Sequence, residues 1–467
     1  MPKNLITNNG TTPSETFFAA ERSFVGDIHT SSTLWPTIQA LCDDYNGRFV
    51  GSADERGAAK YISKTLARHG LSNVHLETFP INGWRRGPAV LTAAGKTFEC
   101  IGLPGTPPCD IDAPIINVAN GESPDFEQVR KTARGKLALI HGTGSHRLEK
   151  YTRAVIAGCA GFIFGGTELG CLPPTGSLEF GGAPAPIPGV GVSHETLLRL
   201  CRLAENGPVY GNLQIKARKY PTKGYNVIAD IPSGEPPPST RQPPPLLMLC
   251  AHYDGHDIAQ GAVDNASGTT AVIEAARALM QVKDQLNIGV RVALWSGEET
   301  GMHGSAAYTN THKQTLAQIK FVFNCDIVSN SGSLWMTING ADTDRTADCL
   351  RGLGAHMVHN LQVDGNSVIV PYSDHFSFYM KGVPALMLAT PHGKHNGMGP
   401  HTSGDTLDKV DVQSLRTSTA YIARAILHLA HNPTLLPAHH ATRAELQTVL
   451  RTAGFEQLLR AQGRWRF

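Results

Sequence analysis

Apolar residues recur at helical spacing near the start of the chain. Between residues 55 and 69, the apolar positions fall three or four residues apart: Ala58, Tyr61, Ile62 and Leu66. This spacing predicts an amphipathic helix, and the Gly70 that follows is typical of a helix end. Residues 74–79 predict a strand. The polar stretch of residues 1–20 is expected to form a loose N-terminal tail.

From residue 85 to residue 219 the chain becomes richer in Gly and Pro. Short apolar runs predict strands at 136–140, 161–164 and 187–192, and helical patterns cover 148–157 and 194–203. Strands that alternate with helices in this way indicate an α/β unit. We therefore expect residues 85–219 to form a smaller inserted α/β domain.

After residue 225 the alternation resumes on a larger scale. Strands are predicted at 226–231, 246–250, 290–295, 321–324 and 383–388, and helices at 269–280 and 412–430. The expected fold class is α/β, with a mainly parallel twisted sheet and helices on both faces. Residues 21–84 and 220–435 would form this domain.

Two further stretches, within and after this domain, are predicted separately. The stretch 232–245 holds many prolines and is expected to be a hairpin-type loop and not a domain linker. Residues 436–467 are expected to form a C-terminal helical extension, with one amphipathic helix over about 443–462.

Composition narrows the possible partners. Hydrophobic residues make up 41% of the 467 residues, and the formal net charge is only +2. No long basic run occurs, so neither nucleic acid nor a membrane surface is an expected partner. The nine cysteines form no CxxC pair, which disfavours a thiolate metal site. The first residues hold no apolar stretch of signal-peptide type, and we expect a cytoplasmic protein.

Metal-competent side chains follow the predicted strands at their ends. The strand at 246–250 leads to His252 and Asp254, and the strand at 290–295 leads to Glu298 and Glu299. Asp326 follows the strand at 321–324. In open α/β sheets ligands bind outside the carboxyl ends of the strands, so these side chains are expected to meet there.

Two further candidates lie in loops. Asp264 stands in the Gly-rich stretch 261–268, directly before a predicted helix, and the loop after the strand at 383–388 carries His392, His395 and His401. For His392 and His395 a solvent-exposed loop is the favoured interpretation. Any one of the other residues alone would be read as a cap or turn residue, but the full set together favours a site.

Imidazole and carboxylate ligands without thiolate suit a catalytic zinc ion. One Asp can bridge two metals roughly 3.5–4 Å apart, and three carboxylates with a bridging hydroxide balance the charge of two Zn²⁺. In the pair Glu298–Glu299 one carboxylate can bind metal while its neighbour transfers a proton. Asp254 is placed to orient the imidazole of His252.

The motifs together resemble those of the co-catalytic di-zinc exopeptidases, which include bacterial leucyl aminopeptidases and glutamate carboxypeptidase II. The resemblance rests on the following segments: Ala251-His252-Tyr253-Asp254, Gly261 to Gly268, Trp295 to Glu299, Asn324-Cys325-Asp326, Ser373-Asp374-His375 and His401 to Thr406.

The resemblance implies a role for each residue. His252 and Asp326 would bind one zinc, Glu299 and His401 the other, and Asp264 would bridge both ahead of a non-proline cis peptide bond to Asn265. Glu298 would be the catalytic general base. These roles imply two Zn²⁺ per chain, with Co²⁺ or Mn²⁺ as alternatives.

One departure from the family pattern concerns the oxyanion. Pro400 stands where many relatives have a Tyr before the last His ligand. Tyr372 or His375 would then contact the substrate in its place, unless the metals suffice.

The inserted segment resembles a protease-associated domain, in the stretches 135–140 and 157–163. In relatives such an insert overhangs the active site, and a purely structural role is the alternative. Oligomers would form through the insert or the C-terminal helix.

The first functional hypothesis is an aminopeptidase acting on peptides or amino-acid amides. A carboxypeptidase or an N-acyl-amino-acid amidohydrolase is the alternative. An aminopeptidase needs an acidic group for the substrate's α-ammonium, and a carboxypeptidase needs Arg or Lys for the carboxylate. The insert contains Arg147, Lys150 and Arg153, but the sequence does not place them at the site. A glutaminyl cyclase would hold one zinc, and an inactive binding scaffold of the transferrin-receptor kind would hold none.

Overall fold

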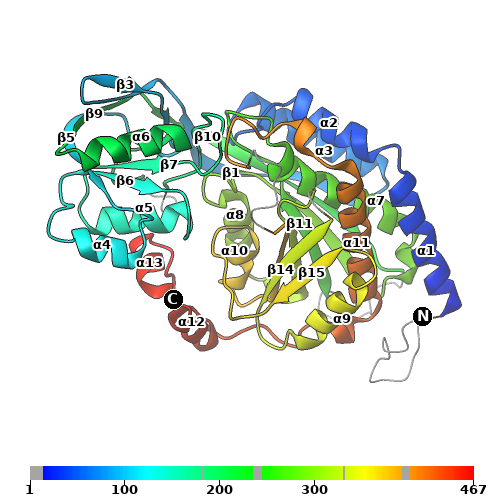
Figure 1. Cartoon of the computed structure of the whole chain (residues 1–467). Helices are drawn as coiled ribbons and strands as arrows, with labels where there is room; N and C mark the ends of the chain where they lie inside the picture. The colour runs from blue at the N-terminus through cyan, green and yellow to red at the C-terminus, as the bar shows by residue number, and fades with distance from the viewer. Residues whose placement is uncertain (1–13, 180–183, 235–243, 330–331, 392–398) are drawn as a thin grey trace.

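The computed structural model describes residues 14–179, 184–234, 244–329, 332–391 and 399–467. Figure 1 shows a larger lobe built around one sheet and a smaller lobe that contains a second sheet. Within the described part of the chain, no helix has the length and apolar character needed to span a membrane.

The first sheet has eight strands in the order β1-β10-β12-β11-β13-β16-β14-β15. Its four central strands run parallel to one another: β12 (Gly289–Trp295), β11 (Leu246–His252), β13 (Ile319–Cys325) and β16 (Ala385–Ala389). The flanking strands are β1 (Ser72–Arg85), β10 (Arg218–Ile231), β14 (Ser333–Asn339) and β15 (Asn360–Asp364). The parallel centre confirms the predicted fold class.

Helices cover both faces of this sheet. Alternate residues of β11 enter two different hydrophobic cores, Leu247 and Leu249 on one face and Met248 and Cys250 on the other. This follows from the two-residue side-chain period of a strand. The first core is covered by α1 (Glu15–Thr30), α2 (Leu34–Asp43), α3 (Ala53–Arg68), α7 (Ser267–Gln281), α9 (Asp344–Gly354) and α11 (Val412–His431). The second is covered by α8 (His303–Thr311) and α10 (His375–Tyr379).

Helix α1 corrects the predicted N-terminal tail. Residues 15–20 are helical, because Ser14 accepts a hydrogen bond from the backbone N–H of Phe17 and caps the helix. Phe17, Phe24 and Ile28 lie on one face and are fully buried in the first core. The helix was missed because polar residues separate these apolar positions in the sequence. Residues 1–13 of the predicted tail lie outside the described part of the chain.

The second sheet belongs to the insert and has the order β3-β2-β9-β5-β6-β7-β8-β4. Its strands are β2 (Ala89–Ala93), β3 (Lys96–Phe98), β4 (Ile101–Gly102), β5 (Cys109–Asn117), β6 (Leu137–His141), β7 (Gly161–Gly165), β8 (Gly189–Val192) and β9 (Tyr210–Ile215). Its helices are α4 (Ser123–Val129), α5 (Arg147–Ile156) and α6 (His194–Glu205). Arg85 of β1 pairs with Arg218 of β10, so the chain leaves and re-enters the first sheet through one antiparallel ribbon.

The structure corrects the predictions for one loop and for the C-terminal helix. The stretch 232–245 does not join neighbouring strands, because β12 lies between β10 and β11 in the sheet. The C-terminal helix is two helices, α12 (Arg443–Thr452) and α13 (Glu456–Ala461), because Gly454 adopts a left-handed conformation with φ +78° between them. Helix α13 packs on α5 of the insert, as Figure 1 shows.

Candidate metal centre

The parallel strands place the predicted ligands at one edge of the sheet. His252 is the last residue of β11, Asp326 directly follows β13, and Glu299 follows β12 by four residues. Nε2 of His252 lies 3.3 Å from Oδ1 of Asp326 and 3.3 Å from Oδ1 of Asp264. These three side chains are buried and form the first ligand group.

A second ligand group lies on the other side of Asp264. Nε2 of His401 is 3.1 Å from Oδ2 of Asp264 and 3.3 Å from Oε2 of Glu299. Each oxygen of the Asp264 carboxylate therefore faces a different group. This is the arrangement that a bridging carboxylate requires.

The distances within both groups fit metal ions. Zinc binds N and O ligands at roughly 2.0–2.1 Å, so two ligand atoms of a tetrahedral site lie roughly 3.3 Å apart. The separations of 3.1–3.3 Å match that value. Oε1 of Glu299 is buried without a hydrogen-bond partner among the described residues, and a small cavity lies beside it and Asp264.

A third histidine, His256, belongs to the second group and was not predicted. Its Nε2 lies 2.9 Å from Oε2 of Glu299, yet the two atoms are not aligned for a hydrogen bond. Its ring packs edge-on against His401 with the ring centres 4.7 Å apart. Burial, followed by the charges of His401 and Arg147, holds the pKa of His256 well below its usual range. A neutral imidazole keeps a lone pair for a metal.

The loop that carries Asp264 is held from two sides. Asp405 accepts hydrogen bonds from the backbone N–H groups of Val263, at 2.7 Å, and Asp264, at 3.1 Å. The side chain of Asn265 donates to the carbonyl of Cys325 at 2.9 Å. The peptide bond between Asp264 and Asn265 is cis, as the family resemblance implied.

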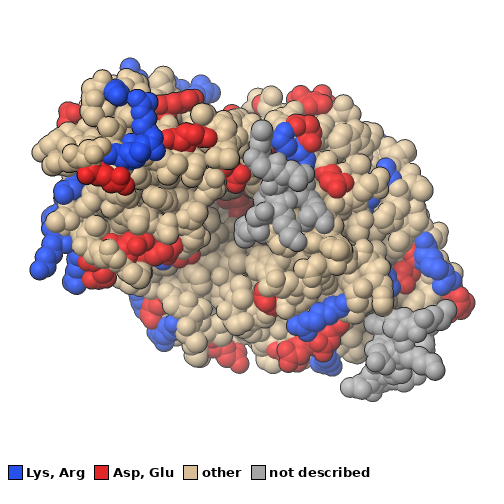
Figure 2. Space-filling model, in the orientation of Figure 1, with Lys and Arg blue, Asp and Glu red and all other residues tan. Residues whose placement is uncertain are grey.

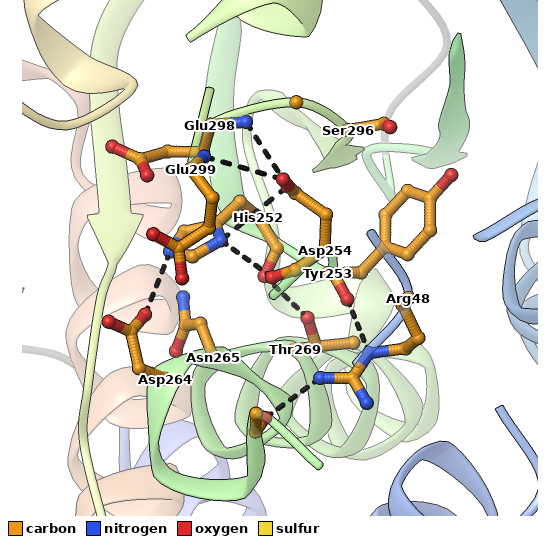
Figure 3. A network of polar contacts seen from close by, with 12 residues as sticks. Arg48, His252, Tyr253, Asp254, Asp264, Asn265, Thr269, Ser296, Glu298 and Glu299 are labelled. Carbon is orange, nitrogen blue, oxygen red and sulfur yellow. Dashed lines mark hydrogen bonds and ion pairs between the residues drawn. The ribbon is translucent and has the colours of Figure 1, made fainter. Parts of the chain in front are cut away.

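Asp254 orders the backbone beneath the two glutamates, as Figure 3 shows. Its carboxylate accepts hydrogen bonds from the N–H groups of Glu298, at 3.1 Å, and Glu299, at 3.3 Å. The nearest partner of Nδ1 of His252 is the backbone oxygen of Asp254 at 3.0 Å, whereas its carboxylate oxygen lies 3.6 Å away. The residue expected to orient His252 therefore does so through its main chain.

A buried arginine, Arg48, supports the loop that carries Asp264. Arg48 is 1% exposed and donates to the carbonyl oxygens of five residues: Leu41, Asn46, Tyr253, Gln260 and Gly261. Figure 3 shows its guanidinium below Tyr253 and beside the loop. No local sequence signal marks this residue, because three of its five partners, Tyr253, Gln260 and Gly261, lie more than 200 residues away in the chain.

The electrostatics of the protein alone favour a bound cation. Burial, together with neighbouring carboxylates, raises the pKa values of Glu298 and Glu299 well above their usual range. The pKa of His252 is also raised, because Asp326, Asp254 and Asp264 outweigh the burial that opposes its positive charge. Groups of this kind retain protons where no metal is bound, and cations would replace those protons.

The two predicted substrate-binding residues lie beside the centre in different roles. Tyr372 stacks on His146 with ring centres 3.9 Å apart, and its hydroxyl hydrogen-bonds to Glu149 and Gln462. It therefore joins the insert to the C-terminal segment. His375 is fully buried, and burial lowers its pKa to about 3. His392 and His395 lie outside the described residues.

Two family models match the chain. The model for peptidase family M28 matches residues 226–426, and the model for the PA domain matches residues 87–200. The chain therefore contains a peptidase family M28 domain over residues 226–426, with a PA domain over residues 87–200. This confirms the resemblance inferred from the motifs, including the inserted protease-associated domain.

Curated relatives and solved structures agree with that assignment. The M28 chain is 25% identical to carboxypeptidase Q of Mus musculus over 419 residues, which is 85% of either chain. It is 26% identical to aminopeptidase YwaD of Bacillus subtilis, covering 84% of this chain and 83% of that protein. A peptidase M28 precursor from Shewanella amazonensis shares its fold with a TM-score of 0.73 at 20% identity, over 92% of this chain and 99% of that chain.

Proposed function

We propose that this M28 chain is a zinc-dependent exopeptidase that hydrolyses a terminal peptide or amide bond. The observation that supports this most directly is the Asp264 carboxylate, whose two oxygens face two separate ligand groups. One zinc ion would be held by His252, Asp326 and Asp264. The other would be held by Glu299, His401 and Asp264, with His256 as an additional ligand.

Zinc at this site would polarise the scissile carbonyl and lower the pKa of water. Glu298 accepts the proton of the attacking water and delivers it to the leaving amine, as a general base and then a general acid. Asp254 holds the main chain of Glu298 in place for this step.

The proposed activity is an aminopeptidase, and a carboxypeptidase or N-acyl-amino-acid amidohydrolase is the alternative. The names of the relatives include both kinds, since aminopeptidase YwaD and carboxypeptidase Q each align over most of the chain. All of these reactions use the same residues at the metal centre. They differ in the charged end of the substrate that the pocket must accept.

The test is a metal count followed by a matched pair of substrates. Zinc-loaded protein is assayed with leucinamide, which has a free α-amine, and with N-acetyl-leucine, which has a free carboxylate. Cleavage of leucinamide alone supports the aminopeptidase, and cleavage of N-acetyl-leucine alone moves the assignment to the alternative. One zinc per chain would favour a cyclase, and none with no turnover would overturn the proposal in favour of a binding scaffold.

A further inference from the structure

Arg147 of the insert reaches the metal centre. It is the first residue of α5 and is 9% exposed, and its Nη1 lies 3.3 Å from Nδ1 of His401. Its guanidinium donates to the carbonyl oxygens of Thr175, at 3.2 Å, and Ser177, at 3.4 Å. The backbone N–H of Thr175 donates to the carbonyl of His401 at 2.7 Å. The insert therefore forms one wall of the site.

The backbone beside Arg147 leaves room for its guanidinium. A Cβ atom at Gly176 would lie 2.0 Å from Cζ of Arg147, and Gly176 has a φ of +130°. Any larger residue would displace the charged group. Glycine at this position keeps the guanidinium next to His401.

Arg147 has no carboxylate within 4.0 Å in the described part of the chain. Arg153, six residues further along α5, shows the contrast, because it pairs with Glu122 at 3.2 Å and Glu149 at 3.1 Å. A buried charge without a counter-ion is strongly unfavourable. The carbonyl contacts of Arg147 satisfy some of its five N–H groups but supply no full negative charge.

A second arginine approaches from the C-terminal segment. Arg464 lies over the rings of Tyr372 and Phe376, with its Cζ 5.8 Å and 5.2 Å from the ring centres. It donates to the carbonyl of Pro371, and it too has no carboxylate within 4.0 Å among the described residues. The neighbouring Gln462 donates to Thr152 of α5 at 3.1 Å, which anchors this segment to the insert.

Arg464 lies beside the loop that carries Glu298, because its Nη2 is 4.0 Å from Sδ of Met302, whose backbone N–H donates to the carbonyl of Glu298 at 2.9 Å. Arg147 and Arg464 both interact electrostatically with Glu298 and with Tyr372, and His146, the neighbour of Arg147, stacks on Tyr372. Two zinc ions would neutralise the carboxylate ligands, so the single charge of Glu298 would remain against the two positive charges of Arg147 and Arg464. A guanidinium matches a carboxylate through paired N–H donors.

We infer that Arg147 and Arg464 bind a free carboxylate of the substrate, so that the preferred substrates are short peptides whose C-terminus lies next to the scissile bond. This inference rests on the proposed exopeptidase function. It holds for an aminopeptidase and for a carboxypeptidase, because both would cleave the single peptide bond of a dipeptide.

The experiment compares Leu-Leu with Leu-Leu-amide, which differ only in the charge at the C-terminus. We expect zinc-loaded wild type to show a kcat/KM for Leu-Leu on the order of 10- to 100-fold higher. Arg147→Gln should bring the two values to within about 3-fold, Arg464→Gln should lower the ratio, and Arg147→Lys should give an intermediate ratio. Arg153→Gln is the matched control and should keep the wild-type ratio.

Equal kcat/KM values in wild type would overturn the inference while leaving the exopeptidase proposal in place. If neither peptide is hydrolysed, the proposed function fails, and calorimetry of zinc-loaded protein with leucine and leucinamide decides the inference separately. Tighter binding of leucine that is lost in Arg147→Gln supports the carboxylate site. Equal binding of the two ligands contradicts it.

Discussion

The carboxylate of Asp254 accepts a hydrogen bond from the backbone N–H of Glu298 at 3.1 Å, although the two residues are 44 positions apart. A second bond to Glu299 fixes the start of the loop that presents both glutamates. Asp254→Ala removes both acceptors and should lower kcat/KM about 10- to 100-fold, as loss of a supporting partner does at metal sites. Asp257→Ala is the control, because Asp257 lies on the same loop but pairs with Arg86. Equal activity in the two variants would refute this role.

Replacement of Glu298 separates proton transfer from metal binding. Glu298→Gln should lower kcat about 10²- to 10⁴-fold, because the amide cannot accept a proton from water. Elemental analysis should find the zinc content unchanged. Glu299→Gln should instead reduce the zinc content, since Glu299 lies in the second ligand group. Near-normal turnover by Glu298→Gln would exclude it as the general base.

Asp264 faces both ligand groups, so Asp264→Ala should reduce the occupancy of both metals. Asp326→Ala removes a ligand of the first group only and should leave one ion in place. The measurement is the number of zinc ions per chain after dialysis against buffered zinc. Loss of a single ion from Asp264→Ala would show that this carboxylate does not bridge.

His256 is expected to affect only the zinc ion of the second ligand group. His256→Gln should weaken zinc binding at the second group, measured by competition with a chelator, while the ion between His252 and Asp326 keeps its affinity. His303→Gln is the matched control, because His303 lies nearby but hydrogen-bonds to the carbonyl of Thr300 at 2.9 Å. Identical chelator curves for wild type and His256→Gln would remove His256 from the ligand set.

Glu55 links stability to pH. Burial raises its pKa from 4.5 to about 7, although Tyr253 and Ser296 each donate to it at 2.8 Å. Between these values the folded state binds the proton more tightly than the unfolded chain, so this contribution to stability is present at low pH and is lost as pH rises through about 7. Glu55→Gln has no titrating group at this position and should not lose stability in this way as pH rises.

Relative to wild type, the free energy of unfolding of Glu55→Gln should therefore rise between pH 5 and pH 8, by on the order of 2–3 kcal/mol. Urea unfolding of both proteins at each pH measures it, and the comparison cancels the titration of other groups. A difference between the two proteins that is constant with pH would contradict the raised pKa.

The strands and the ligands at their ends were predictable because both depend on local pattern. Apolar runs located β11, β12 and β13, and polar residues directly after those runs located His252, Glu299 and Asp326. The bridging position of Asp264 came from the family resemblance, since the Gly-rich loop by itself also fits a turn. The family assignment came from the order of the motifs.

The residues that the sequence did not place at the site depend on tertiary contacts. Arg147 could be named as a cation of the insert but not placed beside His401, and Arg464 was not singled out, because both positions depend on how the insert and the C-terminal segment pack. His256 faces the ligands because its loop folds back onto Asp264. The break at Gly454 was missed because a single Gly is tolerated within a helical pattern. None of these features has a signature within a few neighbouring residues.

The charges at the surface tell less about function than these buried ones. Lys and Arg side chains are interspersed with Asp and Glu over the face shown in Figure 2. The partly or fully buried arginines carry more information, because a buried positive charge needs hydrogen-bond acceptors or negative charges nearby, and these can be identified in the structure.

The hydrogen bonds of Arg48 go to main-chain oxygens. A carbonyl oxygen is present whatever the side chain, so the residues that contact Arg48 are free to vary while the contacts persist. Position 48 itself has no such freedom, because Lys offers fewer donors in a different geometry. In a saturation mutagenesis screen we expect position 48 to tolerate almost no replacement, while the partly exposed Gln260 accepts more.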